Sequence, residues 1–76
     1  MTDEMVTDRA EFDLPYGRQA TLKNVQYASN LQMLRVTLRE NRRFTVIDLD
    51  QASAEALGVE MLAWAREKTP NINNEK

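Results

Sequence analysis

The chain contains no cysteine and no histidine, and these two absences exclude most familiar site chemistry. No disulfide can form, and zinc and other transition metals lose their preferred ligands. Catalysis by a Cys–His pair or a Ser–His–Asp triad is excluded as well. The two serines, Ser29 and Ser53, fall at a predicted turn and in the first turn of a predicted helix, where serine bonds to the local backbone. We therefore expect a non-enzymatic protein with no metal site and no cofactor.

Glycine is scarce and long apolar runs are missing. The two glycines, Gly17 and Gly58, lie far apart, so the chain has no glycine-rich phosphate-binding loop. No apolar stretch approaches the roughly 20 residues of a membrane span. The first 13 residues are acidic and polar, unlike a signal peptide. These features predict a cytoplasmic protein with no membrane partner.

The chain has 76 residues, of which 42% are hydrophobic, so it predicts one small domain. A domain of this size buries only about 60% of its unfolded surface and is marginally stable alone. Small domains compensate with disulfides, metals or oligomerisation. Since the chain has no cysteine for disulfides and lacks the usual metal ligands, oligomerisation is the one of these three that remains open.

Alternating apolar residues predict two antiparallel strands in the first third of the chain. Ala10, Phe12 and Leu14 alternate with acidic residues, which is typical of a half-buried strand. Residues 15–17, Pro-Tyr-Gly, predict a turn in which glycine supplies a positive φ. A second strand begins at Arg18.

The second strand has a break in its alternation. Leu22 and Val25 cannot share one face of a regular strand. The Lys23-Asn24 pair between them therefore predicts either a β-bulge or a short turn that divides two strands. We favour the bulge.

After a turn at residues 29–30, two more strands are predicted over residues 31–40 and 43–49. The two-residue loop at 41–42 is short enough for a tight hairpin. Its register follows from pairing Glu40 with Arg43, which also sets Arg35 opposite Asp48 as a favourable charge pair. A shift by one residue would bury the carboxylate of Asp48. The apolar pairs on the core face are then Leu38–Thr45, Val36–Ile47 and Leu34–Leu49.

A helix follows, with Asp50 as its N-cap and Pro70 ending it. Gly58 inside this pattern either allows a close approach of the helix to the sheet or ends a first helical piece; we favour one continuous helix. The apolar residues at helical spacing are Ala54, Leu57, Met61, Leu62, Trp64 and Ala65.

These elements together predict an α+β fold, in which a small antiparallel β-meander of about four strands carries one C-terminal helix packed on one face. Residues 9–68 form the predicted domain. Residues 1–8 are predicted to be a disordered N-terminal segment, and 69–76 a disordered polar tail.

Asp48, Asp50 and Glu55 could supply oxygen ligands to Mg²⁺ or Ca²⁺. Structural roles explain them better. In the predicted register Asp48 faces Arg35, and Asp50 caps the helix. No EF-hand pattern surrounds them. We therefore assign no metal ligands.

The formal charge of −2 is unevenly distributed. Residues 1–15 carry five acids and one arginine, and residues 44–76 carry six acids and three bases. Residues 16–43 carry six bases and one acid, so the middle of the chain is basic. The predicted register also places Phe44 and Val46 on the sheet face away from the core. The resulting candidate interaction surface comprises Arg35, Thr37, Arg39, Arg42, Arg43, Phe44 and Val46.

An apolar patch rimmed by charges is typical of a protein interface. We therefore expect an interaction or accessory protein that uses this surface to form a homodimer or to bind a larger protein. The alternative is single-stranded nucleic-acid binding through the basic hairpin at residues 35–43, with phosphate contacts and base stacking. A pI near 5.0 weakens long-range attraction to polyanions. A third interpretation is that the arginines pair with nearby acidic residues, in which case this face is solvated and binds no ligand.

Overall fold

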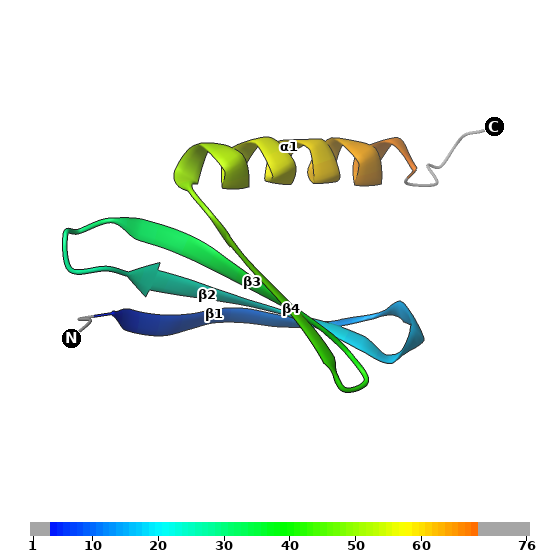
Figure 1. Cartoon of the computed structure of the whole chain (residues 1–76). Helices are drawn as coiled ribbons and strands as arrows, with labels where there is room; N and C mark the ends of the chain where they lie inside the picture. Colours follow the sequence, from blue (N-terminus) through cyan, green and yellow to red (C-terminus); the bar gives the residue numbers. More distant parts are fainter. Residues whose placement is uncertain (1–3, 69–76) are drawn as a thin grey trace.

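The computed structural model describes residues 4–68 and contains a four-stranded antiparallel sheet followed by one helix (Figure 1). The strands lie in the order β1-β2-β3-β4, so each hairpin joins neighbours. The predicted α+β meander is confirmed. The elements are β1 (Met5–Leu14), a 3₁₀ turn η1 (Pro15–Gly17), β2 (Arg18–Gln26), β3 (Gln32–Glu40), β4 (Arg43–Leu49) and α1 (Gln51–Glu67).

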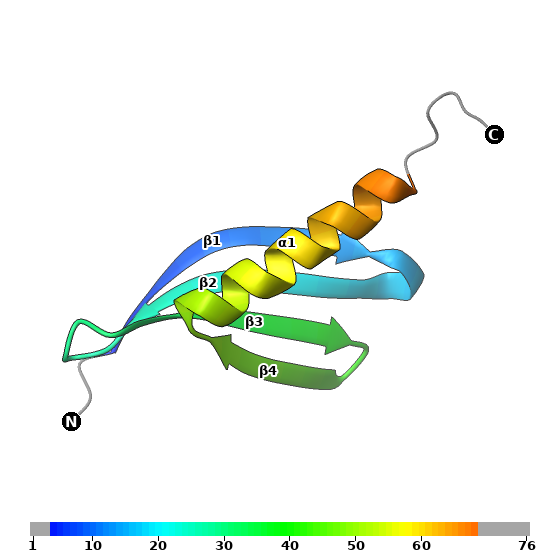
Figure 2. The same cartoon turned by 90° about the horizontal axis from the view of Figure 1, so that it is seen from above.

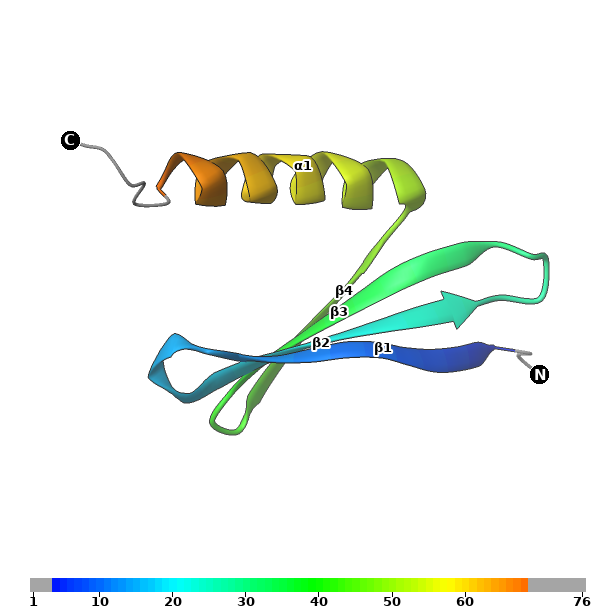
Figure 3. The ribbon, with the colours of Figure 1, turned by 180° about the vertical axis from the view of Figure 1, so that it is seen from behind.

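The helix covers one face of the sheet, which we call the inner face; the opposite face is the outer face. Seen from above, α1 crosses the strands diagonally (Figure 2). Seen edge-on from either side, the helix begins next to the end of β4 and stands away from the twisted sheet along most of its length (Figures 1 and 3). Its main contacts are accordingly with β3 and β4.

The β3–β4 register is the predicted one. Glu40 pairs with Arg43, and Arg35 pairs with Asp48. The two-residue loop closes with Asn41 at φ 58°, a left-handed conformation that asparagine tolerates. Leu34, Val36 and Leu38 on β3 therefore share the inner face with their β4 partners.

The turn at Pro15–Gly17 is also confirmed. Gly17 has φ 73°, as glycine permits, but Tyr16 takes φ 66° as well. The predicted turn at residues 29–30 is present, with Asn30 at φ 66°.

Two predictions about the first hairpin are wrong. Residues 5–8, expected to be disordered, form the first part of β1. Lys23-Asn24 is neither a bulge nor a turn, because β2 pairs regularly with β3 along its whole length. The irregularity lies instead on β1, where Arg9 has no partner between Asp8 and Ala10. The predicted tail at 69–76 lies outside the described residues.

The break in alternation arises because both faces of β2 carry apolar residues. Leu22 lies on the inner face with Val36, whereas Val25 pairs with Val6 and Met33 on the outer face. Val25 is the one fully buried side chain within residues 4–68. The best-covered part of the sheet is therefore on the side away from α1.

The helix is continuous from Gln51 to Glu67, as favoured, and Asp50 is its N-cap. The Asp50 carboxylate accepts a 2.8 Å hydrogen bond from the Ser53 amide. Neither role suggested for Gly58 is found, however. The helix does not end there, and a Cβ built at Gly58 would have no sheet atom within 4 Å. Within the described chain, no helix has the length and apolar character needed to cross a membrane.

Candidate interaction surface

The seven predicted surface residues divide between the two faces and one turn. Arg42 lies in the hairpin turn, and Arg43 pairs with Glu40 on the inner face. The residues that share the outer face are Arg35, Thr37, Arg39, Phe44 and Val46, since Thr37 pairs with Val46 and Arg39 with Phe44.

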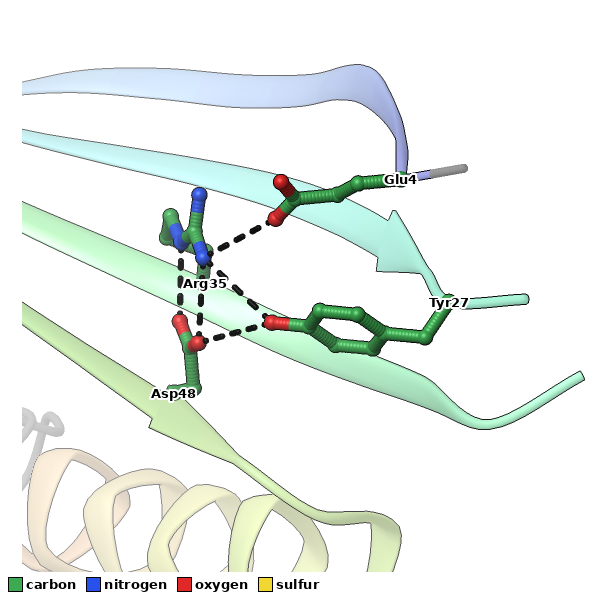
Figure 4. A network of polar contacts seen from close by, with 4 residues as sticks. All are labelled: Glu4, Tyr27, Arg35 and Asp48. Carbon is green, nitrogen blue, oxygen red and sulfur yellow. Dashed lines mark hydrogen bonds and ion pairs between the residues drawn. The ribbon is translucent and has the colours of Figure 1, made fainter. Parts of the chain in front are cut away.

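At one end of the outer face lies a polar cluster made of Glu4, Tyr27, Arg35 and Asp48 (Figure 4). Arg35 donates two hydrogen bonds to Asp48, from Nε at 2.9 Å and from Nη2 at 3.1 Å. Nη2 also lies 3.4 Å from a Glu4 oxygen and donates to the Tyr27 hydroxyl at 3.4 Å. The Tyr27 hydroxyl donates to Asp48 at 3.3 Å. The carboxylates of Glu4 and Asp48 therefore both contact the guanidinium of Arg35, and Asp48 accepts from it in the bidentate geometry that arginine favours.

The electrostatics of the polar cluster follow from these bonds. Hydrogen bonds and the positive charge of Arg35 lower the pKa of Asp48, and the Asp48 carboxylate in turn raises the pKa of Arg35. The pKa of Tyr27 is raised, first by desolvation and then by the negative charge of Asp48. Arg35 is thus committed to charges of its own chain and offers little positive potential to a ligand.

The polar cluster lies at the same end of the outer face as the buried Val25. Tyr27 follows Val25 by two positions, and its hydroxyl reaches Asp48 on β4, so its side chain extends across β3. Glu4 reaches Arg35 from the start of β1. Val6, Val25 and Met33 pair at this end of the outer face. Val25 is fully buried and Met33 half-buried, whereas Val6 is 48% exposed.

At the other end of the outer face lies an exposed group that we call the outer patch, defined as Thr37, Arg39, Phe44 and Val46. Phe44 is 61% exposed and Val46 53% exposed. The guanidinium carbon of Arg39 lies 5.9 Å from the centre of the Phe44 ring, within cation–π range. Arg39 Nε also donates to the Asn41 carbonyl at 3.3 Å, which holds the arginine beside the ring.

The hairpin next to the outer patch is basic and open. A shallow depression is lined by residues 39–43. Glu40 is already engaged, because it accepts a 2.6 Å bond from Arg18. Neither Arg42 nor Arg43 makes an ion pair with any residue from 4 to 68.

Sequence analysis identified Arg35 and Asp48 as partners but missed Glu4 and Tyr27. Glu4 was assigned to the segment predicted to be disordered. Val25 breaks the alternation set by Leu22, and Tyr27 continues the parity of Val25. This break was the available signal for a second apolar face. We attributed it to a bulge instead.

A family model for a family of unknown function, DUF6967, matches residues 3–67. This range spans the whole sheet and the helix. The chain belongs to the DUF6967 family. No curated protein and no solved structure matches the chain significantly.

The described part of the DUF6967 chain offers exposed apolar and basic side chains on its outer face and no metal-ligand cluster. Residues 4–68 contain no group of three or more His, Cys, Asp or Glu side chains placed to hold a metal ion. Asp48 is held by Arg35 and Asp50 by the helix N-terminus, so both have the structural roles predicted for them. What the outer patch offers is an exposed aromatic ring, an aliphatic side chain and a fixed guanidinium.

Proposed function

We propose that this protein is a non-catalytic interaction module that binds a protein partner through the outer patch. The observation that carries the proposal is the exposed pair Phe44 and Val46 beside Arg39, whose guanidinium is held over the Phe44 ring. Aromatic residues and arginine are enriched at the centres of protein interfaces. The polar cluster fixes the other end of the same face, so the patch is presented on a rigid sheet.

Phe44→Asp tests this proposal. The substitution places a charge at the centre of the patch and is expected to abolish capture of the partner from lysates of the source cell. Val59→Asp is the matched control, because Val59 on α1 is apolar and 62% exposed, like Phe44, but is not part of the outer patch and lies about 140° around the helix axis from the half-buried Ala54. Equal recovery of the same partner with wild type and Phe44→Asp would contradict the proposal.

Single-stranded nucleic-acid binding is the second candidate. The cation–π pair of Arg39 and Phe44 favours it, together with Arg42 and Arg43, which make no ion pair within residues 4–68. Stacking on an exposed ring next to basic side chains is the usual mode for single strands. Against it, Arg35 is neutralised within the polar cluster, and Arg43 belongs to the other face. The basic surface is therefore smaller than the sequence suggests.

Titration with short oligonucleotides separates the two candidates. Nucleic-acid binding predicts amide shifts around residues 37–46 that weaken steeply as salt rises. An unchanged spectrum at low salt would eliminate this candidate while leaving the protein-binding proposal intact.

A further inference from the structure

The inner face carries a second exposed apolar surface, and it is larger than the outer patch. α1 touches the sheet mainly through its first turns, where Ala54 is half-buried. Beyond that point the apolar stripe of the helix and the sheet beneath it both stay open to solvent. The large side chains concerned are Phe12, Leu38 and Ile47 on the sheet and Leu57, Met61, Leu62 and Trp64 on the helix, which are 42% to 64% exposed.

The area involved approaches what a stable dimer needs. An aromatic side chain buries about 150–250 Å² when fully covered and an aliphatic one somewhat less, so seven that are each roughly half exposed hold on the order of 600 Å². Stable interfaces bury roughly 800 Å² per partner. Such an area on one face of a chain this small is far more than a scattering of single exposed residues.

The two open surfaces are also complements of each other. In α+β proteins the apolar stripe of a helix packs on the apolar face of a sheet. This chain has one apolar stripe, on α1, and one apolar inner sheet face, and both are incompletely covered. A second copy related by a two-fold axis would supply a helix for the open sheet and a sheet for the open helix, in the same contact. A self-complementary patch of this kind is what a two-fold interface requires.

Gly58 indicates where the two copies meet. It lies on the stripe, one helical turn after Ala54 and one before Leu62, and a Cβ at this position would touch nothing in the single chain. Glycine lowers helix propensity relative to alanine, and no contact within residues 4–68 explains its presence. Two helices that cross at glycine can bring their backbones close together.

We propose that a second copy of this chain covers the inner face, with the two α1 helices crossing at Gly58 between the two sheets. Each helix contacts its own sheet, the partner's helix and the partner's sheet. The outer patches then lie on the two outsides of the dimer, so this interface is independent of the proposed function.

Disulfide cross-linking tests the crossing point directly, because the chain has no cysteine of its own. Gly58→Cys should form a disulfide-linked pair on mild oxidation, since a disulfide needs the two Cα atoms within about 7 Å. Val59→Cys is the matched control, because its side chain leaves α1 about 100° around the helix axis from that of residue 58, and it should stay a single chain. Equal cross-linking of the two variants, or cross-linking of Val59→Cys alone, would overturn the proposal.

Trp64 reports on the interface in the unmodified protein, because it is the sole tryptophan and 60% exposed in the single chain. Sedimentation equilibrium is expected to give the mass of two 8.8 kDa chains, with Trp64 emission shifted to the blue. A one-chain mass at the highest concentration would refute the dimer. A two-chain mass with a fully solvated Trp64 would place the contact elsewhere.

Two further variants separate the inner face from the outer patch. Met61→Glu should weaken the dimer by about a hundred-fold, because it buries a charge in the interface. Val59→Glu and Phe44→Asp should change it by no more than a few-fold. Dissociation by Phe44→Asp but not by Met61→Glu would show that the outer patch joins the copies instead.

Discussion

Arg35 is the residue that ties the outer face together. Its guanidinium contacts side chains from three other places in the chain, namely Glu4 before β1, Tyr27 after β2 and Asp48 on β4. The side chains of Arg35 and Asp48 are 28% and 27% exposed, so the pair is partly desolvated. Its geometry is bidentate, and for that reason a lysine at position 35 would not replace it.

Asp48→Asn should make the stability of the protein less sensitive to acid. Arg35 lowers the pKa of Asp48 below its ordinary value of 3.8, so the ionised carboxylate stabilises the fold above that pH. The contribution is lost as pH falls through the lower, folded-state pKa. We expect Asp48→Asn to lower Tm at pH 7 by on the order of 5 °C, with the difference from wild type shrinking below pH 4.

Thermal unfolding by circular dichroism at pH 7, 4 and 3 measures this effect. Glu60→Gln provides the control, since Glu60 is an exposed carboxylate on α1 that makes no ion pair within residues 4–68. A Tm difference for Asp48→Asn that stays constant over this pH range would mean that the charge of Asp48 contributes nothing.

Among the elements, α1 depends most on local interactions, because the sheet covers so little of it. Asp50 accepts a hydrogen bond from the Ser53 amide, and hydrogen bonding to the side chain and then to the backbone of Ser53 lowers the pKa of Asp50. A helix of 17 residues is only marginally stable without tertiary contacts, so the stability of α1 depends strongly on its N-cap hydrogen bond.

Asp50→Ala should reduce helix content and lower Tm by several degrees. Asp50→Asn should have little effect, because asparagine caps as well as aspartate. The far-UV signal at 222 nm follows the helix. Equal losses in both variants would show that the charge of Asp50, and not its hydrogen bond, stabilises the helix.

Gly58→Ala is expected to act with opposite signs in two backgrounds. In a chain kept monomeric by Met61→Glu, the alanine methyl group points into open space. Alanine then favours the helix over glycine by about 1 kcal/mol. In the wild type the same methyl group lies where the helices cross, and it should weaken association about ten-fold. Helix content and sedimentation measure the two effects, and a gain in both backgrounds would argue against a crossing at this residue.

For the molecule as a whole, folding and association are expected to be coupled. Because one side chain is fully buried within residues 4–68, the single chain gains little from its core. A dimer is stabilised by mass action, so Tm should rise by several degrees for each ten-fold increase in protein concentration. An unchanged Tm from micromolar to millimolar would show that the single chain is stable alone.

The order of the elements, the β3–β4 register and the cap of the helix could be predicted from the sequence, because each follows from neighbouring residues. Glu40 and Arg43 flank a two-residue loop, so every later pair is fixed. Asp50 stands directly before the helical pattern. Local chemistry decided these features.

The second apolar face and the packing of α1 could not be predicted in the same way. Val25 was interpreted as evidence for a bulge because we assumed that only one face of β2 is covered. A close approach to the sheet was one of the two roles considered for Gly58, because we assumed that the helix lies flat on the sheet. Both assumptions concern how the helix and other parts of the chain cover the sheet. The periodicity of a single strand or helix carries no information about that packing.

The irregularity in β1 at Arg9, which has no partner residue on β2, affects solubility. β1 is a free edge, and a regular edge strand is a template on which other chains can add strands and grow into fibrils. The extra residue bends and twists the strand midway, and it places a charge there. An incoming strand could therefore match only half of β1 at a time, which protects a chain with two exposed faces from polymerising along its edge.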